Sequence, residues 1–155
     1  MLQTAEKITQ ELKDKKCNLV LPLDIVCANS LNEKKEAKTF SVDCCPIDKM
    51  ILDIGIQSQK NIMDIISKSK TLIWNGPLGA FETPPFDQGT NNIAKYAANR
   101  TSKKQLISIA GGGDTVSALK ASASISKFSY VSTAGGAFLE WLEGKSLPGI
   151  ESLKI

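Results

Sequence analysis

The 155-residue sequence predicts an α/β protein with an open, mostly parallel β-sheet and flanking helices. Short apolar segments alternate with segments of helical periodicity, which is typical of parallel strands joined by right-handed crossovers. Three of these short segments end in glycine-containing turns, and all eleven glycines lie at or after Gly55. Because 42% of the residues are apolar and 23% are charged, we expect one globular domain with its own core.

The first third of the chain contains no glycine, and apolar spacing defines its elements. Ala5, Ile8 and Leu12 recur at helical spacing, whereas the next apolar run is rich in Val, Leu and Ile and is interrupted by Pro22. The expected elements are a helix over residues 2–16, a buried strand over 18–28 that ends or bends near Asp24, a surface loop over 31–38, and extended segments over 39–43 and 48–54.

After Gly55 the alternation becomes regular. Ile62, Ile65 and Ile66 share one helical face, and Thr90 is a residue type favoured at helix N-caps. The expected elements are a helix over residues 58–67, a strand over 71–74, a helix that begins at Thr90, a strand over 105–110, a helix to about residue 121, a strand over 130–132, and a helix from Gly135 through Glu143.

The glycine turns suggest a binding site for a phosphate-bearing ligand. They lie at residues 75–79, 111–115 and 134–136, and in a parallel sheet such turns meet at the carboxyl edge, where ligands bind. The second and third turns each open a helix, so backbone N–H groups and helix N-termini would face one crevice. The alternative is that the glycines only make tight turns between strand and helix.

Two acidic residues add to this hypothesis. Asp114 directly follows three glycines, and a carboxylate among phosphate-facing amides indicates a magnesium ligand. It is equally explained as an acid favoured by the dipole of a helix N-terminus, with Thr115 as a cap. Glu82 could accept hydrogen bonds from ribose hydroxyls, or it is simply a solvated surface acid.

Composition excludes several other classes of function. The chain has no histidine, which removes the commonest metal ligand and general base and argues against zinc, Ser-His or Cys-His chemistry. A net charge of +3, with lysines interleaved among acids, predicts no nucleic-acid partner. No apolar run reaches the roughly 20 residues of a membrane helix, and the charge-rich start does not resemble a signal peptide. We therefore expect a cytoplasmic protein without a membrane partner.

Two further motifs are interpreted as structural. The four cysteines are Cys17, Cys27, Cys44 and Cys45, and they form no CxxC pair. We expect them to stay reduced, as small core fillers or exposed thiols. The tripeptide Gly144-Lys145-Ser146 resembles the end of a Walker loop, but position 139 is Leu and the tripeptide follows a predicted helix. It is therefore not expected to bind phosphate.

The motifs together resemble the carboxyl-terminal part of phosphoglycerate kinase, in order and spacing, from Ala5 to Leu153. The segments that carry the resemblance are LPLD at residues 21–24, LDIG at 52–55, WNGPLGAFE at 74–82, GT at 89–90, GGGDT at 111–115 and STAGGAFLEWLEGKSLPG at 132–149.

The resemblance implies a two-domain glycolytic enzyme that uses Mg²⁺ and transfers a phosphoryl group between 1,3-bisphosphoglycerate and ADP, giving 3-phosphoglycerate and ATP. Its carboxyl-terminal, Rossmann-like domain binds the nucleotide. The implied site residues are Asn75, Pro77, Gly79 and Phe81 in the nucleotide cleft, Glu82 at the ribose, Gly112 and Gly113 at the transferring phosphoryl group, Asp114 on Mg²⁺, Thr115 at the phosphates, and Gly135 and Gly136 at the helix facing the same charge. Such chemistry requires positioning and electrostatic stabilisation rather than a histidine base.

Departures from the family pattern limit what is expected of this chain. Ala134 replaces the first of three glycines, which requires a negative φ there. Residues 1–155 match a partial nucleotide-binding domain, and the phosphoglycerate-binding amino-terminal domain and a glycine-rich segment with a phosphate-binding lysine are absent from the sequence. We expect the isolated chain to bind ADP or ATP weakly and to be inactive without the missing part as a separate partner. The alternative is a stand-alone nucleotide-binding module or a non-functional remnant.

Overall fold

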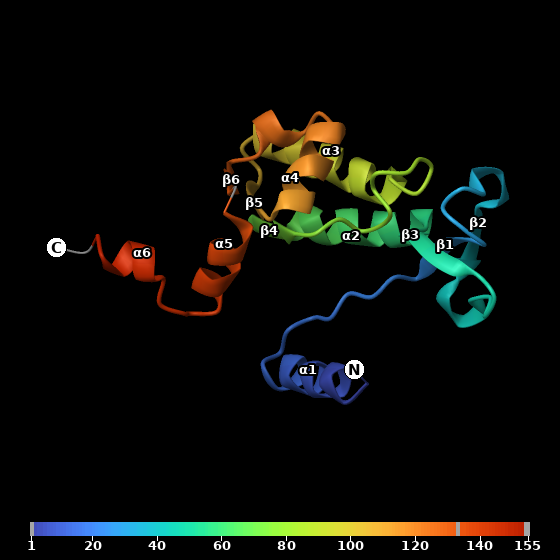
Figure 1. The fold of residues 1–155 in the computed structure, drawn as a ribbon, viewed down its shortest axis with the longest axis horizontal. Coiled ribbons are helices and arrows are strands. Elements are labelled where there is room, and N and C mark those ends of the chain that lie inside the picture. The colour runs from blue at the N-terminus through green and yellow to red at the C-terminus, as the bar shows by residue number, and fades with distance from the viewer. Residues whose placement is uncertain (1, 133, 154–155) are drawn as a thin grey trace.

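A computed structural model describes residues 2–132 and 134–153 of the chain. The helices are α1 (Leu2–Asp14), α2 (Ile56–Lys68), α3 (Gln88–Ser102), α4 (Gly113–Ala121), α5 (Gly135–Leu142) and α6 (Pro148–Glu151). The strands are β1 (Asp24–Ala28), β2 (Lys38–Ser41), β3 (Met50–Ile54), β4 (Thr71–Asn75), β5 (Ile107–Gly111) and β6 (Tyr130–Ser132). Short 3₁₀ turns lie at Lys34–Glu36, Val42–Cys44 and Ile125–Lys127. Figure 1 shows their arrangement in space.

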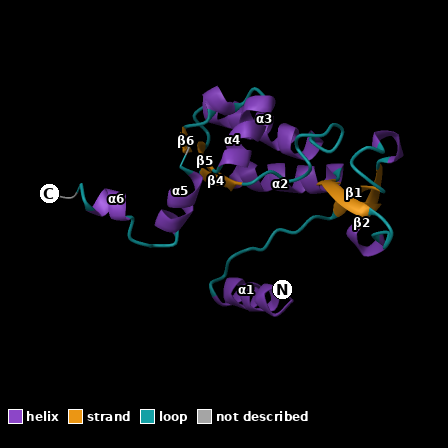
Figure 2. Ribbon diagram, viewed as in Figure 1, coloured by secondary structure: helices purple, strands orange, loops and turns teal. Residues whose placement is uncertain are grey.

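The strands β4, β5 and β6 form a parallel sheet in that order. Helices α2, α3 and α4 lie beside this sheet (Figures 1 and 2). Apolar side chains from the sheet, these helices and the segments between them form the main core, which includes Trp74, Ile93, Leu106, Leu119 and Phe128. The predicted α/β class, with a parallel sheet and flanking helices, is confirmed.

A second sheet joins the first three strands in the order β2-β1-β3, and both of its strand pairs are antiparallel. It lies at the other end of α2 from the parallel sheet (Figure 2). Its own small core contains Ala28, Leu52 and Phe86. The alternation of strands and helices does not reveal this sheet, because antiparallel pairing here is set by contacts between separate segments.

Two predicted element boundaries are wrong. The strand expected over residues 18–28 begins at Asp24 instead of ending there, and residues 17–23 have no regular structure. Pro22 lacks a backbone N–H, and the nearby Leu21 is 64% exposed. Thr90 is not the cap of α3, because the helix begins at Gln88 and Thr90 is fully buried within its first turns.

Helix α1 is well formed but contributes nothing to either core. None of its residues is buried, and Ile8, on its apolar face, is 51% exposed. Figure 1 shows it apart from the sheets, joined to β1 by an extended segment. Its apolar face therefore has no partner within the described residues.

Candidate functional site at the carboxyl edge of the parallel sheet

The three glycine turns meet at one edge of the parallel sheet. Their strands run in the same direction, so the turns that follow β4, β5 and β6 emerge together. The N–H of Gly76 donates a hydrogen bond to Thr115 Oγ1 at 2.7 Å. A Cβ atom added at Gly135 would lie only 2.5 Å from the Cα of Gly112. The first turn therefore contacts the second, and the second contacts the third.

Gly112 occupies a conformation that favours glycine. Its φ of 99° and ψ of 143° place it in a region that residues with a side chain rarely adopt. The Oδ1 atom of Asn75 lies near it, 3.4 Å from where a Cβ would be. Ala134, which precedes α5, has a φ of −95°, so its methyl group is accommodated without the strain of a positive φ.

Helices α4 and α5 begin at this edge, at Gly113 and Gly135. The first N–H groups of a helix have no partner within the helix and carry its partial positive charge. Asp114 lies in the first turn of α4 and is exposed. Added Cβ atoms at Gly113 and Gly136 would meet nothing within 4 Å, so the space outside these two residues is open. The edge can thus attract an anion and offer one carboxylate beside it.

The hydroxyl of Thr115 connects the turns. Thr115 is only 1% exposed, and its Oγ1 accepts the hydrogen bond from Gly76. Thr115 therefore braces the first turn against α4.

The other predicted residues lie on the loop between β4 and α3. They are Pro77, Gly79, Phe81 and Glu82. This loop is fixed by hydrogen bonds from the Leu78 N–H to Thr90 Oγ1 at 3.0 Å and from the Ala80 N–H to the Leu52 carbonyl at 2.8 Å. Glu82 is exposed and Phe81 is half-buried. The structure thus attaches this loop to β3 and α3, whereas the glycine turns contact one another.

Two buried aspartates were missed by the sequence interpretation, although Asp24 and Asp53 lie within its LPLD and LDIG segments. Asp24 accepts hydrogen bonds from the Gln57 and Ser58 N–H groups and from the Ser58 hydroxyl at the start of α2. Burial acts to raise the pKa of Asp24, but these hydrogen bonds hold it below 3.8. Asp53 accepts from Gly89 in the first turn of α3, and burial raises its pKa to about 6.

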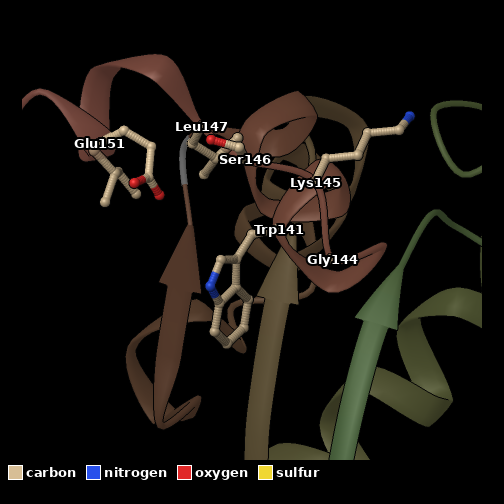
Figure 3. A pocket seen from close by; sticks show the side chains of 7 residues that line it. Trp141, Gly144, Lys145, Ser146, Leu147 and Glu151 are labelled. Carbon is tan, nitrogen blue, oxygen red and sulfur yellow. The ribbon is translucent and has the colours of Figure 1, made fainter.

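The Walker-like tripeptide lies elsewhere, beside a pocket of about 370 Å³ near α5 and α6 (Figure 3). Lys145 is paired with the Glu143 carboxylate, with Nζ and Oε2 2.6 Å apart. In Figure 3 its side chain points away from Trp141. The tripeptide follows α5, as predicted, and its lysine is engaged by a neighbouring acid.

These features place the chain in the class of open α/β proteins whose strand-to-helix turns lie together at one edge of the sheet. The family model for phosphoglycerate kinase matches residues 1–145. The chain therefore belongs to the phosphoglycerate kinase family.

Similar proteins support this assignment over nearly the whole chain. The phosphoglycerate kinase of Methylorubrum extorquens strain PA1 is 52% identical over 154 residues, which are 99% of this chain and 38% of that protein. The structure of phosphoglycerate kinase from Coxiella burnetii is 39% identical, with a TM-score of 0.89 over 97% of this chain and 38% of that one. The enzyme from Pyrococcus horikoshii OT3, 24% identical with a TM-score of 0.79 over 99% of this chain and 36% of that one, shares the fold. The chain thus spans about 38% of the length of the curated relatives it matches.

Within residues 2–132 and 134–153, no group of three or more Cys, Asp or Glu side chains is placed to hold a metal ion. No helix within the same residues is long and apolar enough to cross a membrane. All four cysteines are free, and Cys27 is fully buried.

Proposed function

We propose that this chain is the nucleotide-binding part of a phosphoglycerate kinase. In this proposal the complete enzyme is a cytoplasmic, glycolytic phosphotransferase that moves a phosphoryl group between 1,3-bisphosphoglycerate and ADP. The observation that carries the proposal is the meeting of the glycine turns at the carboxyl edge of β4, β5 and β6. This edge is where open α/β sheets bind ligands, and membership of the phosphoglycerate kinase family supports a nucleotide as that ligand.

The loop after β4 would hold the nucleoside. Pro77, Gly79 and Phe81 would line the cleft together with Asn75, and the exposed carboxylate of Glu82 would accept hydrogen bonds from the ribose hydroxyls. The attachment of this loop to β3 and α3 supports this role, because a fixed loop loses little entropy on binding.

The glycine turns would hold the phosphates. The backbone N–H groups of Gly112, Gly113, Gly135 and Gly136 would face the transferring phosphoryl group, and the α4 and α5 N-termini would stabilise its charge. Thr115 would support the phosphates by holding the first turn against α4.

A single carboxylate beside the glycine turns is enough for a magnesium site. Mg²⁺ is commonly held by one or two carboxylates together with substrate phosphates and water, rather than by a cage of protein ligands. Asp114 is exposed in the first turn of α4, beside the amides that would hold the phosphates, so the residues present fit the ion. When bound, Mg²⁺ would neutralise phosphate charge, and Asp114 would orient it.

We further propose that this chain acts beside the rest of the enzyme, which residues outside these 155 would supply, including the phosphoglycerate-binding domain. Several surfaces support this view. One edge of β4 is unpaired among the described strands, and Ile73, Ile107 and Tyr130 on the parallel sheet are 49%, 55% and 59% exposed. Apolar sheet surface of this kind is normally covered. The chain alone would therefore bind nucleotide but not turn it over.

Calorimetric titration of the chain with ADP, with and without Mg²⁺, tests the proposal. We expect magnesium-dependent binding that Asp114→Ala weakens at least ten-fold, or by about 1.4 kcal/mol. Asp64→Ala removes an exposed carboxylate from α2 and should leave the affinity unchanged. Absence of ADP binding, or magnesium-independent binding that survives Asp114→Ala, would contradict the proposed site.

A further inference from the structure

One buried carboxylate lies between the loop after β4 and the start of α3. Asp53, in β3, is 2% exposed. Its Oδ1 accepts a hydrogen bond from the Ile54 N–H at 2.8 Å, and its Oδ2 accepts one from the Gly89 N–H at 2.8 Å. A Cβ at Gly79 would lie 2.5 Å from Oδ1, and a Cβ at Gly89 would collide with the same atom. The carboxylate therefore fills the space that the two glycines leave open.

The same contacts limit where the loop can lie. The loop leaves β4 at Gly76, which is held by Thr115, and it enters α3 beside Asp53. Between these points, Gly79 lies close to Asp53 and to the carbonyl oxygen of Phe86, which would be 2.6 Å from a Cβ at Gly79. A shift of the carboxylate would therefore move both the loop and the first turn of α3.

We propose that Asp53 is a positioning residue for nucleotide binding: its ionised carboxylate fixes Gly79 and the α3 N-terminus against β3, and so holds Pro77, Phe81 and Glu82 in their binding arrangement. The inference rests on the proposed function of this loop. Nothing in the motifs assigns Asp53 such a role.

The surroundings of Asp53 make this anchor sensitive to pH. A cavity of about 320 Å³ lies beside it, and the other lining side chains are uncharged, among them Val26, Thr39 and Gln59. The negative charge of Asp87, directly before α3, repels that of the Asp53 carboxylate. Burial, with a smaller contribution from Asp87, raises the pKa of Asp53 to about 6 although the N–H groups of Gly89 and Ile54 favour the ionised form.

Protonation has opposite effects on stability and on loop position. Because the folded pKa lies above the usual 3.8, the contribution of Asp53 to stability is complete below pH 3.8 and is lost as the pH rises through about 6. The protonated carboxyl, however, has an O–H on one oxygen and no net charge, so it accepts the backbone N–H groups more weakly than the carboxylate does. The hold of Asp53 on the start of α3 and the adjacent loop is thus strongest above pH 6 and weakens below it, while the fold gains stability.

Nuclear magnetic resonance of the ¹⁵N-labelled chain tests the anchor directly. We expect the amide signals of Gly79 and Gly89 to titrate together between pH 5 and 7.5, with a midpoint near 6. Asp53→Asn should abolish this titration, whereas Asp24→Asn, which alters the equivalent contact at α2, should leave it in place. In parallel, the affinity of the wild-type chain for MgATP is compared with that of Asp53→Asn at each pH. The ratio of wild-type to variant affinity should fall about ten-fold from pH 7.5 to pH 5, equivalent to about 1.4 kcal/mol.

The wild-type titration decides the matter even if a variant does not fold. Gly79 and Gly89 amides that do not titrate in this range would overturn the proposal, as would an affinity ratio that does not change with pH. Titrating amides without MgATP binding at any pH would establish the anchor but refute the proposed nucleotide site. The two failures are therefore distinguishable.

Discussion

The contact between Gly135 and Gly112 predicts the effect of a single methyl group. In Gly135→Ala, the new Cβ would lie 2.5 Å from the Cα of Gly112 and 3.0 Å from its N atom, whereas ordinary contacts begin at 3.4 Å. Both neighbours are backbone atoms, so the two turns must separate by about 1 Å. Overpacking of this kind costs about 1–3 kcal/mol.

We expect Gly135→Ala to lower the free energy of unfolding by that amount, which is a melting-temperature decrease of roughly 2–4 °C per kcal/mol. Because the separation opens the proposed phosphate site, ADP affinity in the presence of Mg²⁺ should fall about ten- to a hundred-fold. Differential scanning calorimetry and isothermal titration measure the two effects. Gly149→Ala is the matched control, since its Cβ would meet nothing within 4 Å and Gly149 lies in α6, outside the proposed phosphate site. Equal behaviour of the two variants would refute the reasoning.

Gly55→Ala should destabilise the fold by about 1–3 kcal/mol in denaturant unfolding, because the new Cβ would collide with the Asp24 carboxylate; a change below about 0.5 kcal/mol would contradict this. Since the pKa of Asp24 is lowered, its contribution to stability should disappear as the pH falls below 3.8, and Asp24→Asn should flatten that part of the stability profile. Added reductant should leave the melting temperature unchanged, because the cysteines are free. The isolated chain should show no turnover of 3-phosphoglycerate and ATP in a coupled assay, because holding both substrates is worth about 7–11 kcal/mol; turnover that Asp114→Ala abolishes would contradict this.

Local signals predicted the parallel sheet and its turns well. The strand over residues 130–132 has the predicted bounds, and α4 begins within the predicted GGGDT turn, because glycine and short apolar runs act over a few residues. Contacts between distant segments could not be predicted. Asp24 meets Ser58, 34 residues away, and Asp53 meets Gly89, 36 residues away. Thr90 was expected as a cap from its residue type, but its hydroxyl instead accepts a hydrogen bond from Leu78.

The edge of β4 that pairs with none of the described strands affects how this chain behaves in concentrated solution. An open strand edge is a template for pairing with other chains, and proteins usually protect it with proline, charge or a bulge. The strand Thr71–Asn75 contains no proline, glycine or charged residue, and its register with β5 is regular. The chain alone should therefore self-associate as its concentration rises, and any segment that covers β4 should keep it monomeric and raise its apparent melting temperature by mass action.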